Sequence, residues 1–172
     1  VGEGLCRECP EVIVENGGDI YAHAARRLMV TVHAGERSPF AGKLLFRCDP
    51  AGKPVGIATS SATVGPSLSF GRADAVCIVA DDAVAADAAA TAVGNRVTAP
   101  AEVEAAIEAG KGMPGVRGIL LALGERRGGW GGGYEFDSFA CAEVSAVLFV
   151  DGVVPVFVDA EAGGEAAVAV GV

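Results

Sequence analysis

Apolar and polar residues alternate along several short stretches in the first third of the chain. Residues 11–15 (EVIVE) alternate in this way and lead into Asn16-Gly17-Gly18-Asp19, after which residues 20–22 continue in an extended pattern. A period of two indicates strands, and Asn-Gly is typical of a tight hairpin turn. The pattern therefore predicts a hairpin here, followed by strands over 28–32, 43–47 and 55–59 in an antiparallel meander.

The pattern then changes to a strand followed by a helix. Residues 75–80 (AVCIVA) form a continuous apolar run, which is typical of a strand buried on both faces. The alanine-rich segment that follows predicts a helix over 81–93, opened by its two aspartates. Gly94 or Asn95 can end this helix.

A second helix is predicted over 99–109. Thr98 is the N-cap candidate, Pro100 lies in the first turn, and Gly110 follows the expected end. Another strand is predicted over 119–123.

The last quarter contains two turn signals. The glycine-rich stretch 126–131 is interpreted as a connection between strands, and Asp151-Gly152 predicts a hairpin because both residues tolerate a positive φ. Strands cluster first and helices follow, so the expected fold class is α+β, with a largely antiparallel sheet and packed helices. We expect one domain over 1–172.

Composition removes several classes of function. Half the residues (51%) are hydrophobic, which favours a folded globular domain over a disordered chain. The net charge is −9 and there is no basic run, so neither duplex nucleic acid nor an anionic membrane surface is an expected partner. The longest apolar stretch, 144–158, is interrupted by Asp151-Gly152 and is too short to span a bilayer.

Five cysteines do not form the even pattern of a secreted disulfide framework, so a reducing, cytoplasmic location is expected. Cys6 and Cys9 make half of a zinc or redox signature, but no second pair completes four ligands. We interpret them as incidental thiols. A role for the cysteines as working groups is the weakest hypothesis, because the sequence supplies no base beside them.

The first candidate site is the segment Glu15-Asn16-Gly17-Gly18-Asp19, with its turn at the two glycines. Adjacent glycines let backbone N–H groups approach a ligand, and such donors bind phosphate. Asp19 can accept a hydrogen bond from a ribose hydroxyl. The alternative is an ordinary hairpin turn.

The second candidate site follows the strand predicted at 55–59. Thr59, Ser60 and Ser61 bring hydroxyl groups to its end, where they suit the oxygens of a polar or anionic ligand. A solvated loop is the alternative. A catalytic serine is not expected, because neither His23 nor His33 has the sequence context of a nucleophile elbow.

The third candidate lies inside the helix predicted over 81–93. Asp87 and Thr91 are four residues apart and project from one face, so together they offer a carboxylate and a hydroxyl to a hard cation. Mg²⁺ typically takes one or two protein carboxylates and completes its shell with water and phosphate. The alternative is a solvated Asp87, with the Thr91 hydroxyl bonded to a backbone carbonyl.

These three segments, in this order, resemble the ApbE family of FAD-dependent flavin transferases. The motifs ENGGDIY, GIATSSATVG, SLSFGRADAV and ADAAATAVGNRV are most similar to the non-lipoprotein branch of that family. The similarity covers about 11–97 and, more weakly, 118–130. It implies a T-fold-related architecture, a missing upstream N-terminal segment, and FAD bound by Asn16, Gly17, Gly18, Asp19, Thr59, Ser60 and Ser61.

The resemblance further implies that Asp87 and Thr91 hold Mg²⁺ near the FAD pyrophosphate, and that FMN passes to a protein threonine. The transferases carry an H-x-x-D-P-x-T-G loop where this chain reads PSLSFG at 66–71, without His or Asp-Pro. We therefore predict nucleotide binding without efficient transfer, and no catalytic residue is assigned.

Two functions follow as hypotheses. The first is an FAD-binding protein with Mg²⁺-dependent FMN transfer or FAD pyrophosphate cleavage. The second is a non-catalytic binding or assembly protein in sulfur or redox metabolism. The expected partner is a nucleotide, while a protein acceptor and a homo-oligomer stay open.

Overall fold

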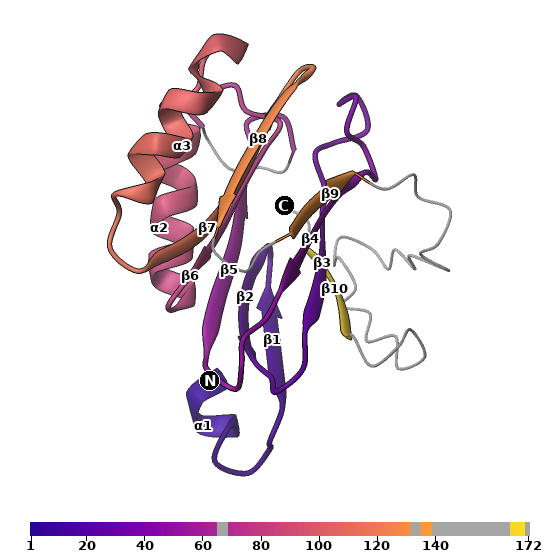
Figure 1. Ribbon diagram of the computed structural model, residues 1–172, viewed down its shortest axis with the longest axis vertical. Coiled ribbons are helices and arrows are strands. Elements are labelled where there is room, and N and C mark those ends of the chain that lie inside the picture. Colours follow the sequence, from indigo (N-terminus) through magenta and orange to yellow (C-terminus); the bar gives the residue numbers. More distant parts are fainter. Residues whose placement is uncertain (65–68, 132–134, 139–165, 171–172) are drawn as a thin grey trace.

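The computed structural model describes residues 1–64, 69–131, 135–138 and 166–170. Figure 1 shows the layers side by side: a helical layer at the left, a first sheet beside it, and a second sheet on the far side of the first. The α+β class with mainly antiparallel strands is confirmed, although the strands divide between two sheets. No helix in the described ranges is both long enough and apolar enough to cross a membrane.

The central layer, sheet A, is antiparallel throughout and has the order β1-β2-β5-β6-β7-β8. Its strands are β1 (Val12–Asn16), β2 (Asp19–His23), β5 (Val55–Ser60), β6 (Ala75–Ala80), β7 (Val116–Leu123) and β8 (Arg126–Gly131). The predicted hairpin at the start of the chain is confirmed as β1 and β2.

The second sheet, sheet B, has the order β10-β3-β4-β9. Its strands are β3 (Leu28–Val32), β4 (Leu44–Cys48), β9 (Glu135–Ser138) and β10 (Ala166–Val170), and only the β10–β3 pair is parallel. The predicted meander is therefore wrong in its path. β2 pairs directly with β5, which brings Asp19 opposite Ala58, and the β3–β4 hairpin instead covers the face of sheet A.

Two apolar cores separate the layers, because alternate residues of sheet A point to opposite faces. On β6, for example, Ala75, Cys77 and Val79 face sheet B, while Val76, Ile78 and Ala80 face the helices. The core between the sheets also includes Ile20, Ala22, Leu28, Val30, Val32, Leu44, Cys48, Val55, Ile57, Leu120 and Ala122. The predicted burial of this strand on both faces is confirmed.

Helix α2 (Ala83–Gly94) confirms the prediction over 81–93 to within two residues. Asp82 caps it, its carboxylate accepting from the Ala85 amide at 2.8 Å. The helix lies very close to β5, since a Cβ on Gly56 would come within 2.0 Å of the Asp82 backbone. The alanine-rich sequence and this glycine are therefore what allow the helix and strand to touch.

The second helix begins and ends differently from the prediction over 99–109. A 3-10 turn (Pro100–Glu102) precedes α3 (Val103–Lys111). The Thr98 side chain does not accept a hydrogen bond from the first turn of the helix, as an N-cap side chain would. Instead, the Thr98 backbone N–H donates to Glu102 Oε2 at 2.7 Å. Gly110 lies inside the helix and not beyond it, because its lack of a side chain leaves room for Ile119 of β7.

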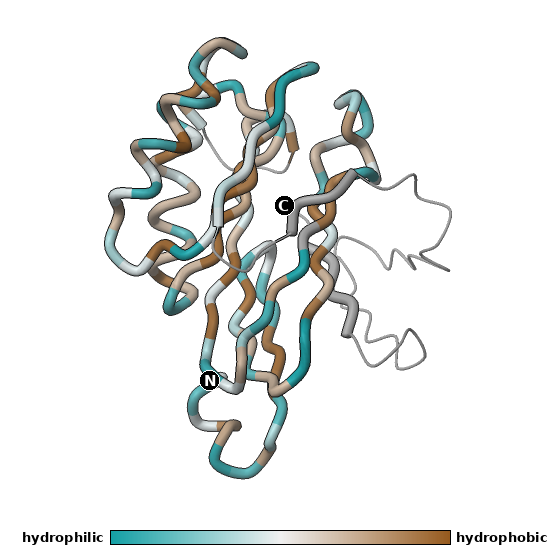
Figure 2. The backbone as a smooth tube through the Cα atoms, in the orientation of Figure 1, coloured by the Kyte–Doolittle hydropathy of each residue, from teal (hydrophilic) through white to brown (hydrophobic). Residues whose placement is uncertain are grey.

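The glycine-rich stretch 126–131 is also a correction, since it is a strand (β8) and not a connection. Glycine is uncommon in strands, but here α3 packs directly on it: a Cβ on Gly128 would lie 2.6 Å from Ile107 Cδ1. Figure 2 shows apolar colour on the central strands of sheet A, whereas β8 is pale and the tip of the β7–β8 hairpin is polar. The hairpin predicted at 151–152 lies outside the described residues.

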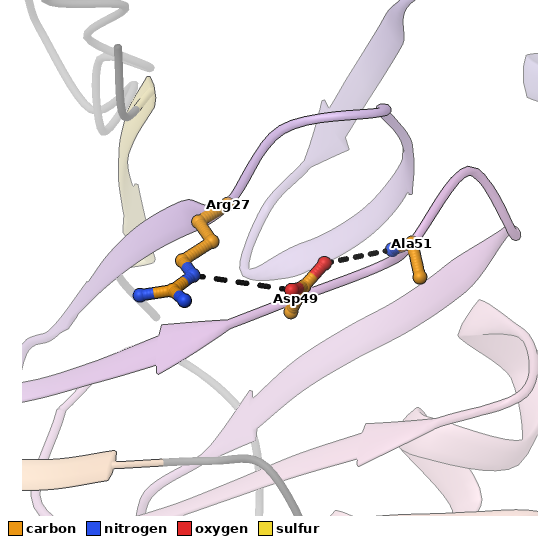
Figure 3. Close-up of polar contacts among 3 residues, drawn as sticks. All are labelled: Arg27, Asp49 and Ala51. Carbon is orange, nitrogen blue, oxygen red and sulfur yellow. Dashed lines mark hydrogen bonds and ion pairs between the residues drawn. The ribbon is translucent and has the colours of Figure 1, made fainter. Parts of the chain in front are cut away.

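The connection from β4 to β5 is held by polar contacts (Figure 3). Asp49 Oδ1 accepts from the Ala51 amide at 3.0 Å, and Arg27 Nε lies 3.9 Å from Asp49 Oδ2. Ala51 has a φ of 51°, a backbone angle that residues other than glycine rarely adopt. The ring Nε2 of His23 is 3.0 Å from the Gly52 carbonyl oxygen. A short helix, α1 (Gly2–Leu5), precedes β1.

Candidate functional site

The β1–β2 turn requires both of its glycines. Gly17 has a φ of 61° and Gly18 a φ of 99°, and Gly18 is buried. The Gly18 amide donates to Glu15 Oε1 at 3.2 Å, and its carbonyl accepts from the Thr59 amide at the same distance. The turn is thus joined to the end of β5. Its Gly18 N–H becomes available to a ligand only if Glu15 gives it up.

Asp19 and Asp87 approach one another, although 68 positions separate them in the sequence (87 − 19). Asp19 is half-buried at the start of β2. Burial raises the pKa of its carboxyl first, and the negative charges of Asp87 and then Glu15 raise that pKa further. Helix α2 also contacts β2, so the turn and the helix motif lie near one another, and both contribute negative charge there.

Asp87 and Thr91 lie on the exposed side of α2, while Ala86, Ala90 and Val93 of the same helix are buried. Among the described residues, neither polar side chain forms a hydrogen bond or an ion pair. The back-bonded arrangement considered for Thr91 is accordingly not formed. A carboxylate and a hydroxyl are both left free to contact a ligand.

The three hydroxyls at the end of β5 do not point to one place. Thr59 is 7% exposed and faces sheet B, away from α2, as its neighbour Ile57 does. Ser60 faces the helix layer, where its Oγ would be 3.8 Å from a Cβ on Gly94. Ser60 is therefore on the same side of the sheet as Asp87, and Thr59 is not.

The Thr59 hydroxyl lies across the β5–β6 pair from Cys77. Burial raises the pKa of the Cys77 thiol to about 12, and the Thr59 hydroxyl acts weakly in the opposite direction. A thiol is a poor hydrogen-bond partner, and no hydrogen bond of normal geometry reaches Thr59 Oγ1 from the described residues.

Ser61 shapes the loop after β5. It is 3% exposed, and its Oγ accepts from the amides of Thr63 at 3.1 Å and Val64 at 3.0 Å. This is a local serine turn. The Ser61 hydroxyl oxygen therefore already accepts hydrogen bonds that hold the backbone of the loop at Thr63 and Val64.

The donor set suits a hard cation only in part. Asp87 and Thr91 provide two free oxygens, and a cation beside Asp19 and Asp87 would compensate the charge that raises the Asp19 pKa. Across the described ranges, no cluster of three or more His, Cys, Asp or Glu residues has metal-binding geometry. Two protein oxygens could serve a Mg²⁺ only if water and phosphate supplied its other ligands.

Two residues at the site were given no binding role from the sequence. Glu15 holds the turn, and a signal existed, because a carboxylate three residues before a glycine can reach its amide. Asn95 was expected only to end the helix, but its Oδ1 also accepts from the Phe70 amide at 2.9 Å. Its signal is spacing, since Asn95 follows Thr91 by four residues, as Thr91 follows Asp87.

The N-terminal thiols lie apart from these groups. Cys6 Sγ is 3.4 Å from the Tyr21 hydroxyl, and this hydrogen bond is the main reason that the Tyr21 pKa rises to about 12. Cys9 is exposed, and both cysteines are free thiols. Their interpretation as incidental thiols stays a prediction.

Comparison with known proteins identifies the family. A family model described as AbpE bacteria matches residues 1–125, a range that contains every candidate site residue. A UPF0280 protein of Methanosarcina barkeri is 47% identical over 120 residues, covering 69% of this chain and 47% of that protein. Another from Methanothermobacter thermautotrophicus is 41% identical over 120 residues, covering 67% and 46%. The chain spans about half the length of these curated relatives, and it belongs to this ApbE-related family.

Proposed function

We propose that this protein binds a flavin nucleotide of the FAD type together with Mg²⁺, on the surface between the β1–β2 turn and the exposed side of α2. The observation that carries the proposal is the contact between α2 and β2, which places Asp87 near enough to Asp19 for its charge to raise the Asp19 pKa. Two motifs of an ApbE-like site, far apart in sequence, thereby share one surface. Membership of the ApbE-related family supports the same ligand.

Asp87 and Thr91 would hold the cation, since both are exposed and neither has another partner among the described residues. Mg²⁺, when bound, supplies the positive charge that a pyrophosphate needs in a chain of net charge −9. Asp19 would accept from a sugar hydroxyl, and the glycine turn would allow the ligand to approach the backbone closely.

Binding and transfer are separate questions for this chain. General acid–base chemistry needs a titratable group within reach of the reacting atoms. The described part of the loop that replaces H-x-x-D-P-x-T-G contributes Ser69, Phe70 and Gly71, none of which can fill that role at neutral pH. We infer binding without efficient FMN transfer, and slow hydrolysis of the pyrophosphate as the most that positioning and charge would support.

A non-catalytic binding or assembly role is the second candidate, and the same loop favours it. A protein that kept the turn and the helix motif but lost the acid and base would present a nucleotide without processing it. The two candidates differ in turnover and not in the ligand.

Isothermal titration of FAD, FMN, ADP and ATP, each with and without Mg²⁺, tests the binding. We expect FAD to bind only with Mg²⁺, and Asp87→Asn to weaken that binding at least about tenfold, or 1.4 kcal/mol. Glu104→Gln is the matched control, because it removes one exposed carboxylate from the neighbouring helix α3. Equal binding by the wild type and Asp87→Asn contradicts the metal assignment, and no nucleotide binding contradicts the proposal as a whole.

The transfer step needs a separate measurement. The protein is incubated with FAD, Mg²⁺ and a flavinylation-acceptor protein, and covalent flavin fluorescence is read on a denaturing gel. We expect little or no labelling. Stoichiometric labelling within minutes would show that the loop chemistry is not required.

A further inference from the structure

The polar row on α2 continues beyond the two predicted metal ligands. Asp87, Thr91 and Asn95 follow at intervals of four, so they lie along one side of the helix. Asn95 is the C-cap, and its amide donates to the Thr91 carbonyl at 3.0 Å. The Asn95 side chain bonds to the loop before β6: its Oδ1 accepts from the Phe70 backbone amide at 2.9 Å and from Ser69 Oγ at 3.4 Å.

The backbone on the far side of Phe70 is fixed as well. The Gly71 amide donates to Ser69 Oγ at 3.2 Å, and the Arg72 amide donates to the Val97 carbonyl at 2.7 Å. Gly71 lies directly against the end of α2, where a Cβ would come within 1.9 Å of the Gly94 carbonyl oxygen. Hydrogen bonds and close packing therefore hold the Phe70 backbone against the C-terminal end of the helix.

The Phe70 side chain is nevertheless 78% exposed. Among the described residues, the other strongly exposed large apolar side chains are Val1, Leu5 and Val84, so Phe70 is the only aromatic one. Single exposed apolar residues are common and mean little on their own. Phe70 differs because its backbone is anchored to a residue of the polar row.

We propose that Phe70 is a stacking surface for a planar ring of the bound nucleotide, positioned by Asn95. This inference rests on the proposed function. Asp87 and Asn95 are eight residues apart, or about 12 Å along the helix at 1.5 Å per residue. A dinucleotide whose pyrophosphate lies near Asp87 extends its sugar and ring over such a distance. Aromatic side chains stack on planar bases with little dependence on the identity of the base.

Titration of FAD, FMN and ADP into Phe70→Ala, Phe70→Trp and the wild type, with Mg²⁺ throughout, tests the inference. We expect Phe70→Ala to weaken FAD binding about 5- to 150-fold, the range that stacking on one ring provides, and Phe70→Trp to retain it. An effect on FMN but not on ADP assigns the ring to the flavin, and the reverse assigns it to adenine. Either result supports the stacking surface.

Val84→Ala is the matched control, because Val84 is 80% exposed at the opposite end of α2. If the stacked ring is the flavin, quenching of FMN fluorescence gives a second readout, which we expect Asn95→Ala to reduce although Phe70 itself is intact. If the ring is adenine, we expect Asn95→Ala to weaken ADP binding instead. If the wild type binds FAD and Phe70→Ala binds it within twofold, the stacking surface is wrong and the proposed function stands. If the wild type binds none of the three nucleotides, both are wrong.

Discussion

Helices α2 and α3 pack on the same face of sheet A, and they use their polar side chains in opposite ways (Figure 1). At α3 most of these side chains are engaged: Glu102, just before the helix, accepts from Thr98, and Lys111 pairs with Glu108 and lies over the Trp130 ring. In α2, Asp87 and Thr91 have no partner within the described ranges. Polarity alone therefore does not mark the candidate site. What marks the site is a pair of polar side chains that has no partner in the described part of the chain and lies near another charged side chain, Asp19.

The positions of the helices explain this difference. α2 lies over the central strands β5 and β6 and comes close to β2, while α3 lies over β7 and β8 at the edge of sheet A. Only α2 is therefore near the glycine turn and Asp19. Its close approach to the sheet depends on small residues, so the helix that carries the candidate site is also the one least tolerant of added atoms.

The largest expected effect is on the packing of α2. Gly56→Ala places a Cβ within 2.2 Å of backbone atoms of Asp82 and Ala83, which cannot move without shifting the helix. We expect the free energy of unfolding to fall by about 3 kcal/mol or more. Urea denaturation measures it.

Gly110→Ala in α3 is the comparison, because its Cβ would meet the flexible ends of Ile119 and Val93. We expect it to cost about 1 kcal/mol or less, since rotamer changes relieve the contact and alanine favours the helix. Equal costs would mean that the two helices are packed alike.

The next largest effect concerns the turn beside α2. Gly18→Val introduces a β-branched side chain at a φ of 99°, so we expect a loss of about 2 kcal/mol in stability and the loss of nucleotide binding. Gly17→Asn is the control, because its φ of 61° suits asparagine and the surrounding space is open. If Gly18→Val folds and binds the nucleotide with normal affinity, the turn is an ordinary hairpin and not part of the binding site.

Asp19 gives a smaller, pH-dependent effect. Its pKa is raised in the folded protein, so its contribution to stability is fully present at pH values below the usual aspartate pKa and is lost as the pH rises through the raised value. Asp19→Asn should therefore be more stable than the wild type at pH 7, by less than about 1 kcal/mol because water screens this half-exposed group. The two proteins should converge near pH 3 in thermal unfolding.

Added Mg²⁺ sharpens this test. If the cation binds beside Asp19 and Asp87, it should stabilise the wild type at pH 7 and thereby reduce the advantage of Asp19→Asn. An advantage that Mg²⁺ leaves unchanged would argue against a cation at this position.

The smallest effect is at the start of α3. Hydrogen bonds from the Thr98 amide and hydroxyl and from the Ala99 amide lower the pKa of Glu102. The stabilisation they provide is present above the usual glutamate pKa and disappears as the pH falls through the lowered value. Glu102→Gln should lower Tm by a few degrees at most at pH 7 and should match the wild type in strong acid, with nucleotide binding unchanged.

Sequence patterns predicted the parts of the fold that local physics decides. The hairpin at Asn16-Gly17 and the start of α2 at Asp82 follow from turn and cap preferences that act over a few residues. The division of strands between two sheets could not be predicted this way, because the pairing of Asp19 with Ala58 depends on contacts across an entire intervening hairpin.

The candidate site shows the same limit. The i, i+4 spacing placed Asp87 and Thr91 on one exposed side of a helix, but the opposite orientations of Thr59 and Ser60 depend on which face of β5 meets which layer. Gly110 was mistaken for a helix end because its role is to admit Ile119 from a strand that comes later in the chain. The assignment of FAD and Mg²⁺ as ligands rests on the resemblance to the ApbE family, and the titrations test it.

The parallel pairing of β10 with β3 has a consequence for how the protein is made. Leu28 is opposite Ala166, a separation of 138 positions (166 − 28), whereas the last strand of sheet A is complete at residue 131 and leaves the ribosome before β10 does. On the ribosome, sheet A and its helices can assemble while the outer edges of β3 and β4 are still unpaired. During that interval the nascent chain exposes strand edges of the kind that chaperones protect from aggregation.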